Sequence, residues 1–315
     1  MRAAAAPGRR KQRRFVTAAA RWGGRDHFLV QPRVGDIREA SPFRELQYNR
    51  LLFRGMTKLS VESPRQNAWD YSGYYADRLY DGVPYPSSVR EGHPWTSAHP
   101  RPLLAAASFK VHGAFSNGRQ QLQAVCSAHP RCIFVAVGGA PRREDLRPVL
   151  DAYRYSTFCL QPPGDSISRK AVVDSLLLGC IPVFFHPAQR DQWPWHFAGW
   201  SANASVLIES GPHDDMAGLM ANLSHVPSEQ VRRMQATIAE HAWRLVYRVA
   251  DRPSAEGRLE IDAFRITLLE LARKRALPYE RRKCTAFATY GSRRCKQWTT
   301  TYVALTRPGG KAVRG

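Results

Sequence analysis

From residue 118 onward, short apolar segments alternate with stretches long enough to form helices. The segments that we expect to be strands are 132–137, 157–161, 181–185 and 205–208. The helices expected between and after them are 119–128, 144–155, 168–178, 214–223, 228–247 and 262–275. Because 133–137 and 181–185 are almost continuously apolar, both faces of their sheet must be covered. The sequence therefore predicts an α/β fold in which helices flank a parallel sheet.

The first hundred residues follow a less regular pattern. Strands are expected at 27–30, 57–61 and 108–115. Residues 64–102 are rich in Pro, Gly, Tyr and Ser, which is typical of a loop. The regular alternation of strands and helices is thus confined to the later part of the chain.

The charge of the chain is concentrated at its ends. The sequence carries 47 Lys and Arg against 26 Asp and Glu, and a net charge of +21 by itself suggests a nucleic acid or an anionic membrane as partner. Residues 1–25 hold eight basic residues and no acidic one, and residues 271–315 hold twelve basic residues and one acidic. The body, 26–270, has 27 basic and 25 acidic residues and is nearly neutral. We therefore expect no nucleic-acid partner.

The cysteines and tryptophans leave structural and functional interpretations open. Cys126 and Cys132 are six residues apart and form either a disulfide or two buried thiols. Cys159 and Cys180 are expected to be core thiols. The three tryptophans of the segment 193–200 either stack on a sugar ring or pack inside a loop.

One segment combines the features of an anion-binding site. Residues 158–164 form an apolar strand that ends in a Pro-Pro-Gly turn, and a helix is expected to begin near Ser168, which suits the N-cap. The helix N-terminus offers free N–H groups and the positive end of the helix dipole, both of which suit a phosphate. Arg169 in the first turn would oppose that dipole unless an anion pairs with it. Asp174, about one and a half turns further, is within reach of a ribose diol held above the helix.

The alternative is an ordinary strand–turn–helix crossover, in which Ser168 or an aspartate caps the helix and Arg169 lies at the surface. The spacing of the residues leaves both interpretations open. In either case the segment follows the carboxyl end of a parallel strand, which is where α/β sheets bind their ligands.

The same segment resembles the signature of the exostosin family, glycosyltransferase family 47. The plant and algal branch that includes xyloglucan galactosyltransferases shows the run Phe-Cys-Leu-Gln-Pro-Pro-Gly-Asp-Ser, then Thr/Ser-Arg, Asp-Ser and Gly-Cys-Ile-Pro-Val-Phe-Phe. Residues 158–185 contain each of these in order. Further parts of the family pattern are resembled by residues 24–30, 59–63, 83–86, 195–196, 205–208 and 226–231. The resemblance covers roughly residues 21–275.

The resemblance implies a GT-B fold, in which two Rossmann-like domains face each other across the active site. It implies an inverting glycosyltransferase of the Golgi lumen that transfers a galactosyl or glucuronosyl group from a UDP-sugar to a polysaccharide or glycoprotein. The residues expected to bind the nucleotide sugar are Gly164, Asp165, Ser166, Ser168, Arg169 and Asp174. No cofactor or metal is expected, because Arg169 and the helix dipole can neutralise the leaving diphosphate.

An inverting transfer also needs a general base near the acceptor hydroxyl. Asp165 and His27 are weak candidates, and each has a structural alternative, as a turn residue and at a strand end respectively. The sequence therefore predicts the donor site in more detail than the catalytic group.

The resemblance also suggests how the chain is divided. We expect a basic leader at 1–20, a remnant of the N-terminal, acceptor-side domain at 21–102, the exostosin-type nucleotide-sugar-binding domain at 103–276 and a basic tail at 277–315. Family members carry a membrane anchor and most of a Rossmann domain before the segment 24–30, so an N-terminal truncation is expected, with membrane association only through the missing anchor. A nucleotide-sugar-binding fragment without activity is the alternative to an active enzyme.

Overall fold

The structure is a computed structural model, and it divides into two compact units. It describes residues 28–31, 56–61, 80–89, 100–111, 116–137, 146–164, 167–208, 216, 218–247 and 262–276. One unit comprises Met1–Ser60, Asp70–Asp81 and Glu270–Gly315, and the other comprises Val61–Trp69 and Gly82–Leu269. The domain boundaries expected from the sequence stay a prediction.

A three-stranded sheet has the order β1-β2-β3, and its first two strands are parallel. Its strands are β1 (Phe28–Gln31), β2 (Thr57–Ser60) and β3 (Tyr80–Gly82). The first two occur close to where apolar segments predicted strands. In the second of these strands Leu59 is buried, and Met56, directly before this strand, is buried as well.

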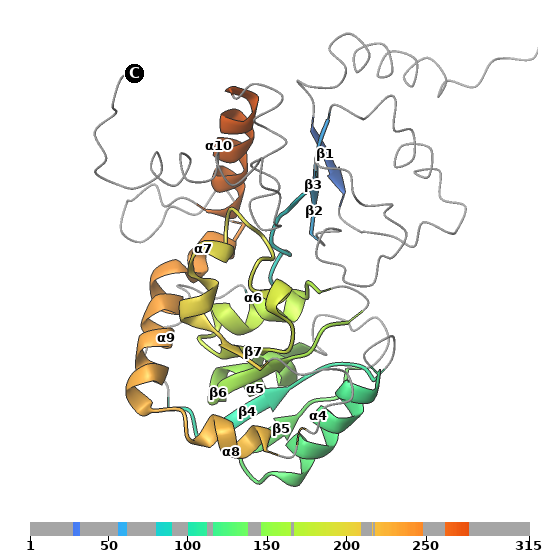
Figure 1. Cartoon of the computed structure of the whole chain (residues 1–315), viewed down its shortest axis with the longest axis vertical. Helices are drawn as coiled ribbons and strands as arrows, with labels where there is room; N and C mark the ends of the chain where they lie inside the picture. The colour runs from blue at the N-terminus through green and yellow to red at the C-terminus, as the bar shows by residue number, and fades with distance from the viewer. Residues whose placement is uncertain are drawn as a thin grey trace, which may run out of the picture. The chain divides into compact units, whose positions relative to one another are not determined.

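The larger unit contains a five-stranded sheet with the order β5-β4-β6-β7-β8, and every neighbouring pair is parallel (Figure 1). Its strands are β4 (Leu103–Ala107), β5 (Cys132–Phe134), β6 (Ser156–Gln161), β7 (Ile181–Phe184) and β8 (Val206–Leu207). This arrangement confirms the predicted α/β class. The chain first moves from β4 to β5 on one side, then crosses to β6 on the other. The strand order therefore reverses between β4 and β6, which makes this point the topological switch of the sheet.

Helices occur between these strands and after the last of them. They are α4 (Ser116–Ala128), α5 (Arg147–Tyr155), α6 (Lys170–Leu177), α7 (Ala198–Ser201) and, after the last strand, α8 (Leu219–Ser224), α9 (Ser228–His241) and α10 (Ala263–Ala276). Short 3-10 turns are η3 (Pro187–Gln189), η4 (Ala202–Ala204) and η5 (Ala242–Leu245). The long helix expected at 228–247 is thus α9 followed by a separate 3-10 turn. No helix among the described residues combines the length and apolar character needed to cross a bilayer.

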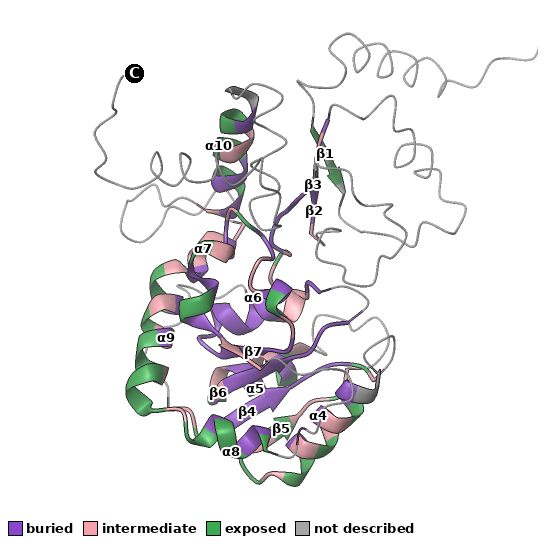
Figure 2. Ribbon diagram, viewed as in Figure 1, coloured by how far each residue is buried: buried purple, intermediate pink, exposed green. Residues whose placement is uncertain are grey.

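The two faces of β4 show how helices cover the sheet. Successive strand residues point to opposite faces. Ala105 and Ala107 belong to one core cluster together with Leu122 of α4, whereas Ala106 belongs to a second cluster together with Tyr153 of α5. The helices α4 and α5 therefore cover opposite faces, and Figure 2 shows buried residues along the strands between exposed outer helix surfaces.

The prediction of a strand at 108–115 is wrong. The strand is β4, at Leu103–Ala107, and the described residues after it, 108–111, form no strand. Three consecutive alanines have low strand propensity, which hid this strand in the sequence. All three are fully buried at the centre of the sheet, where small side chains allow the helices to approach closely.

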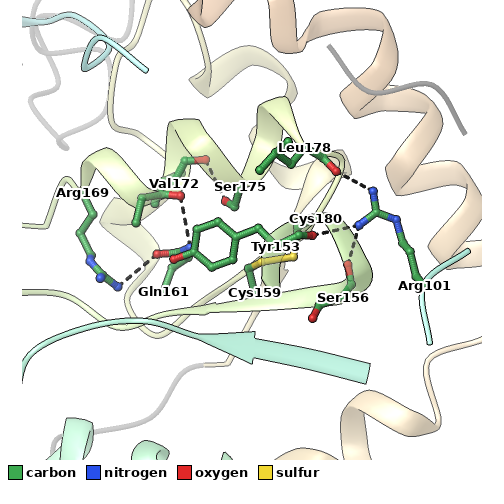
Figure 3. Close-up of a disulfide and its surroundings, with 11 residues drawn as sticks. Arg101, Tyr153, Ser156, Cys159, Gln161, Arg169, Val172, Ser175, Leu178 and Cys180 are labelled. Carbon is green, nitrogen blue, oxygen red and sulfur yellow. Dashed lines mark hydrogen bonds between the residues drawn. A yellow bond between two sulfur atoms is a disulfide. The ribbon is translucent and has the colours of Figure 1, made fainter. Parts of the chain in front are cut away.

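Two disulfides join elements of the larger unit. Cys126 and Cys132 are bonded across the α4–β5 connection, so the disulfide interpretation of this pair is the correct one. Cys159 and Cys180 are also bonded, which corrects the expectation that both are core thiols (Figure 3). Both are fully buried, as expected, and their Cα atoms lie 5.8 Å apart. The bond was hidden because 21 residues separate the two cysteines in the sequence, whereas the parallel strands β6 and β7 bring them together.

The tryptophans of segment 193–200 are mainly packing residues. Trp193 is fully buried and donates its indole N–H to the carbonyl oxygen of Val61 at 3.2 Å. Trp200 is buried against Phe197 with ring centroids 4.8 Å apart. Trp193 also has a φ of 52°, which is unusual for a residue with a side chain and is held by the surrounding packing.

Candidate functional site

The guanidinium of Arg169 lies at the topological switch of the five-stranded sheet. Its Nη2 donates to the carbonyl oxygen of Ser108, which directly follows β4, at 2.9 Å. Its Nη1 donates to the side-chain oxygen of Gln161 at 3.1 Å and to the carbonyl oxygen of Pro162 at 3.2 Å, both at the end of β6. One side chain thus connects the carboxyl ends of the two strands between which α/β sheets place their ligands.

The local backbone explains why Arg169 points toward the sheet. The helix α6 begins at Lys170, and Arg169 occupies its N-cap position with extended angles of φ −139° and ψ 135°. This corrects the expectation that Ser168 is the N-cap and that Arg169 lies in the first helical turn. Because the backbone of Arg169 is extended, its side chain can point away from the helix axis. The guanidinium then donates to carbonyl oxygens at the strand ends, and these acceptors offset its unfavourable position near the positive end of the helix dipole.

Among the described residues, every hydrogen-bond acceptor of the Arg169 guanidinium is neutral. These acceptors are two main-chain carbonyl oxygens and one amide oxygen, and no carboxylate among the described residues pairs with this guanidinium. Burial lowers the pKa of Arg169 from its ordinary value, but an arginine keeps its proton in proteins. Arg169 is only partly exposed, and a charge withdrawn from water in this way is unfavourable unless a counter-charge is near. The site is therefore prepared for an anion that approaches from outside.

A second arginine, which the sequence analysis did not identify, reinforces this arrangement. Arg119 of α4 is buried and donates to the carbonyl oxygens of Pro163 at 3.0 Å and Lys110 at 2.6 Å. The guanidinium carbons of Arg119 and Arg169 lie 5.7 Å and 5.9 Å from the centroid of the Phe109 ring. The sequence feature that could have indicated its role is that Arg119 is a basic residue in a helix expected to pack against a buried sheet.

Asp174 is already engaged within the chain. Its Oδ1 accepts hydrogen bonds from the hydroxyl of Ser87 at 2.6 Å and from the main-chain N–H of Ser88 at 2.9 Å. Its Oδ2 accepts from Nζ of Lys170 at 2.5 Å, and the same ammonium group donates to the hydroxyl of Ser88 at 2.7 Å. The carboxylate expected to bind a ribose thus holds the segment at 83–89 against α6. The sequence analysis identified this segment but did not predict the contact.

The other predicted residues are only partly described. Gly164 and Ser168 are buried on either side of the turn between β6 and α6. Asp165, Ser166 and His27 lie outside the described residues. The roles of all the predicted residues, including the two weak candidates for the general base, therefore stay predictions. No cluster of three or more His, Cys, Asp or Glu suited to a metal occurs within the described parts of the chain.

Comparison with known proteins identifies the family. The Exostosin GT47 domain matches residues 3–211, which is more than half of the chain. The chain belongs to the exostosin GT47 family. This family is the one that the segment 158–185 resembles, so the recognition from sequence is confirmed.

Relatives of this exostosin chain include two plant proteins. The xyloglucan galactosyltransferase MUR3 of Arabidopsis thaliana is 31% identical over 266 residues, which cover 78% of this chain and 40% of that protein. The probable xyloglucan galactosyltransferase GT13 of the same plant is 30% identical over 271 residues, covering 81% of this chain and 55% of that protein. The exostosin chain therefore spans about half the length of these curated relatives.

Solved structures show a more distant likeness. The calicheamicin glycosyltransferase CalG4 is 14% identical, with a TM-score of 0.34 over 84% of this chain and 73% of that chain. The α/β class of the exostosin chain consequently rests on its own parallel sheet and crossover helices.

Proposed function

We propose that this chain supplies the donor-binding part of an inverting GT-B glycosyltransferase, which transfers a sugar from a UDP-sugar to a polysaccharide. The observation that supports this most directly is the guanidinium of Arg169, which is oriented at the switch point of the sheet by acceptors that, within the described segments, are all neutral. A diphosphate is the anion that such a site suits, because its oxygens accept from a guanidinium and from the N–H groups at the start of α6.

In this proposal Arg169 binds the diphosphate and stabilises the negative charge that develops on it when the sugar leaves. Asp174 would accept hydrogen bonds from the ribose hydroxyls, which would replace the hydroxyl of Ser87 as donor to the carboxylate. No metal ion or cofactor takes part, since Arg169 and the helix dipole neutralise the leaving group. The general base would come from residues outside those described.

The proposed acceptor and donor follow the relatives. MUR3 is named a xyloglucan galactosyltransferase, and several further relatives are named probable xyloglucan galactosyltransferases. We therefore propose a galactosyl transfer to a cell-wall polysaccharide of the xyloglucan type.

The two disulfides support a location in an oxidising compartment. Disulfides form and persist in the secretory pathway and are rare in the reducing cytosol. Both bonds lie in the unit that carries the proposed donor site. We propose the lumen of the Golgi as the place where the protein acts.

A second candidate function is a nucleotide-sugar-binding module without transferase activity. It is favoured by the share of the relatives that the chain spans, 40% of MUR3 and 55% of the second relative. An acceptor-binding part could lie in the remaining length. The two candidates share the donor site and differ in whether this chain alone transfers a sugar.

The test uses the full chain with radiolabelled UDP-galactose and xyloglucan oligosaccharides. Transfer that is lost in Arg169→Ala and retained in the control Arg232→Ala, a change at an exposed arginine of α9, supports the enzyme. UDP binding by calorimetry without any transfer supports the second candidate. Absence of both UDP binding and transfer contradicts both.

A further inference from the structure

Gln161 connects three parts of the site through one side chain. It is the last residue of β6 and is fully buried. Its amide oxygen accepts from Nη1 of Arg169 at 3.1 Å, and its amide nitrogen donates to the carbonyl oxygen of Ala171 at 3.4 Å (Figure 3). Because a guanidinium can only donate, the oxygen of the amide must be the atom that faces Arg169.

Further buried amides hold the backbone of Gln161 in place. The side chain of Gln189 donates to the carbonyl oxygen of Gln161 at 2.8 Å and accepts from the main-chain N–H of Phe185 at 2.9 Å. The side chain of Gln192 in turn donates to the carbonyl oxygen of Gln189 at 2.7 Å. All three glutamines are fully buried. The side chains of this supporting network are therefore buried, hydrogen-bonded to the main chain and uncharged.

The neutral surroundings of Arg169 contrast with those of two lysines, each of which is paired with a carboxylate. Lys170, next to Arg169, forms an ion pair with Asp174. Lys274 of α10 is buried and forms an ion pair with Asp81. The same chain therefore provides carboxylates for these two lysines, whereas Arg169 receives an amide at a position where a glutamate would have the same shape.

Tyr153 does not supply the missing negative charge. Its ring lies beside Gln161 and is fully buried (Figure 3). Burial raises the pKa of the Tyr153 hydroxyl above its ordinary value, which outweighs the opposing effects of Arg169 and Gln161. The phenol therefore stays neutral at physiological pH, so no negative charge from the described part of the chain pairs with Arg169.

We propose that Gln161 is a positioning residue of the donor site, which directs the guanidinium of Arg169 by a hydrogen bond while leaving its full charge to a bound diphosphate. A glutamate would give the same hydrogen bond but would also neutralise the arginine. The identity of the ligand rests on the proposed function, whereas the argument about charge requires only an anion of diphosphate chemistry.

Gln161→Glu and Gln161→Met separate the two parts of this role. The glutamate keeps the shape and the acceptor toward Arg169, adds a counter-charge, and loses the donor to the carbonyl oxygen of Ala171, a donor that methionine lacks as well. We therefore expect its affinity for inorganic pyrophosphate to fall about tenfold or more. The methionine keeps the charge of Arg169 but removes the acceptor, so it weakens pyrophosphate binding about threefold and lowers the melting temperature. Gln230→Glu, at an exposed position of α9, controls for the added charge.

The order of the dissociation constants, measured by calorimetry on the full chain, decides the question. The proposal requires wild type to bind pyrophosphate most tightly, the methionine variant less tightly and the glutamate variant least. A glutamate variant that binds as well as wild type, or better than the methionine variant, overturns it, because then only the hydrogen bond matters. If the glutamate variant does not fold, an unchanged affinity in the methionine variant overturns the proposal.

The same experiment distinguishes this inference from the proposed function. Suppose that the pyrophosphate affinities of wild type and the two variants follow the stated order, but wild type neither binds UDP nor transfers galactose. The inference then stands and the proposed function fails. If wild type transfers galactose from UDP-galactose and the Gln161 variants bind pyrophosphate unchanged, the function stands and the inference fails. If wild type binds neither pyrophosphate nor UDP, both are wrong.

Discussion

Arg169 and Ser108 are joined across the point at which the strand order of the sheet reverses. Nη2 of Arg169 donates to the carbonyl oxygen of Ser108 at 2.9 Å, although 61 residues separate the two in the sequence. Ser108 directly follows β4, whereas Arg169 directly precedes α6 in the connection that leaves β6. The Arg169 side chain therefore joins the segment that follows β4 to the segment that follows β6, and it also places a positive charge between them.

Arg169→Lys tests whether shape as well as charge is needed. A lysine keeps the positive charge, but its single ammonium cannot reproduce the flat fork that reaches acceptors at both strand ends. We expect UDP affinity to fall by about tenfold, whereas the control Arg232→Lys, at an exposed position of α9, should bind UDP as wild type does. Calorimetry measures both, and an unchanged affinity in Arg169→Lys would contradict the two-sided role of the guanidinium.

Ser87→Ala and Asp174→Ala test the proposed ribose contact. If the ribose must replace the hydroxyl of Ser87 on Oδ1 of Asp174, removing that hydroxyl tightens UDP binding, by about threefold. Removing the carboxylate weakens it by about tenfold. Pyrophosphate has no ribose, so its affinity should not change in Ser87→Ala. Weaker UDP binding in Ser87→Ala would instead mean that the contact orders the site.

The two disulfides should stabilise the fold unequally. The bond between Cys159 and Cys180 closes a longer loop than the bond between Cys126 and Cys132. Loop-closure entropy then gives a loss of about 3 kcal/mol for the first pair replaced by alanine and about 2 kcal/mol for the second. Urea unfolding of the two double variants measures the difference. Equal losses would show that packing, and not loop length, dominates.

The stability of the fold should fall as the pH is lowered because of His196. Burial lowers the pKa of this imidazole to about 4, while its Nε2 lies 3.0 Å from the carbonyl oxygen of Ala263. As the pH falls, His196 of the unfolded chain takes up a proton near pH 6.5, before His196 of the folded protein does. The contribution of neutral His196 to the free energy of unfolding is therefore complete above pH 6.5 and is lost toward pH 4.

By pH 5 the loss due to His196 amounts to about 2 kcal/mol. Urea unfolding at pH 7 and pH 5 measures it, and His196→Gln should remove most of the difference.

The sequence was most informative where a strand is apolar along most of its length. Strands β6 and β7 and the helix between them were predicted closely, because burial on both faces favours apolar residues, although β6 also buries polar Ser156 and Gln161. The strand β4 was missed because its alanines have no strand preference of their own, and only their place at the centre of the sheet explains them.

The site was predicted unevenly for a related reason. Arg169 and Asp174 lie in one continuous segment with a recognisable pattern. Arg119, Ser87 and Ser88 reach the same region from other parts of the chain, and their contacts depend on tertiary structure. Sequence spacing does not indicate which main-chain carbonyl oxygens accept hydrogen bonds from a guanidinium. These partners are therefore known only from the structure.

The bond between Cys159 and Cys180 encloses the segment that carries Gln161, Arg169 and Asp174. In covalent terms this part of the protein is a ring. A protease that cuts the ring once opens it without releasing a fragment, and both new ends stay tethered to the two central strands. A single cut within the ring would therefore pass unnoticed on a non-reducing gel, and two pieces would separate only after a reductant is added.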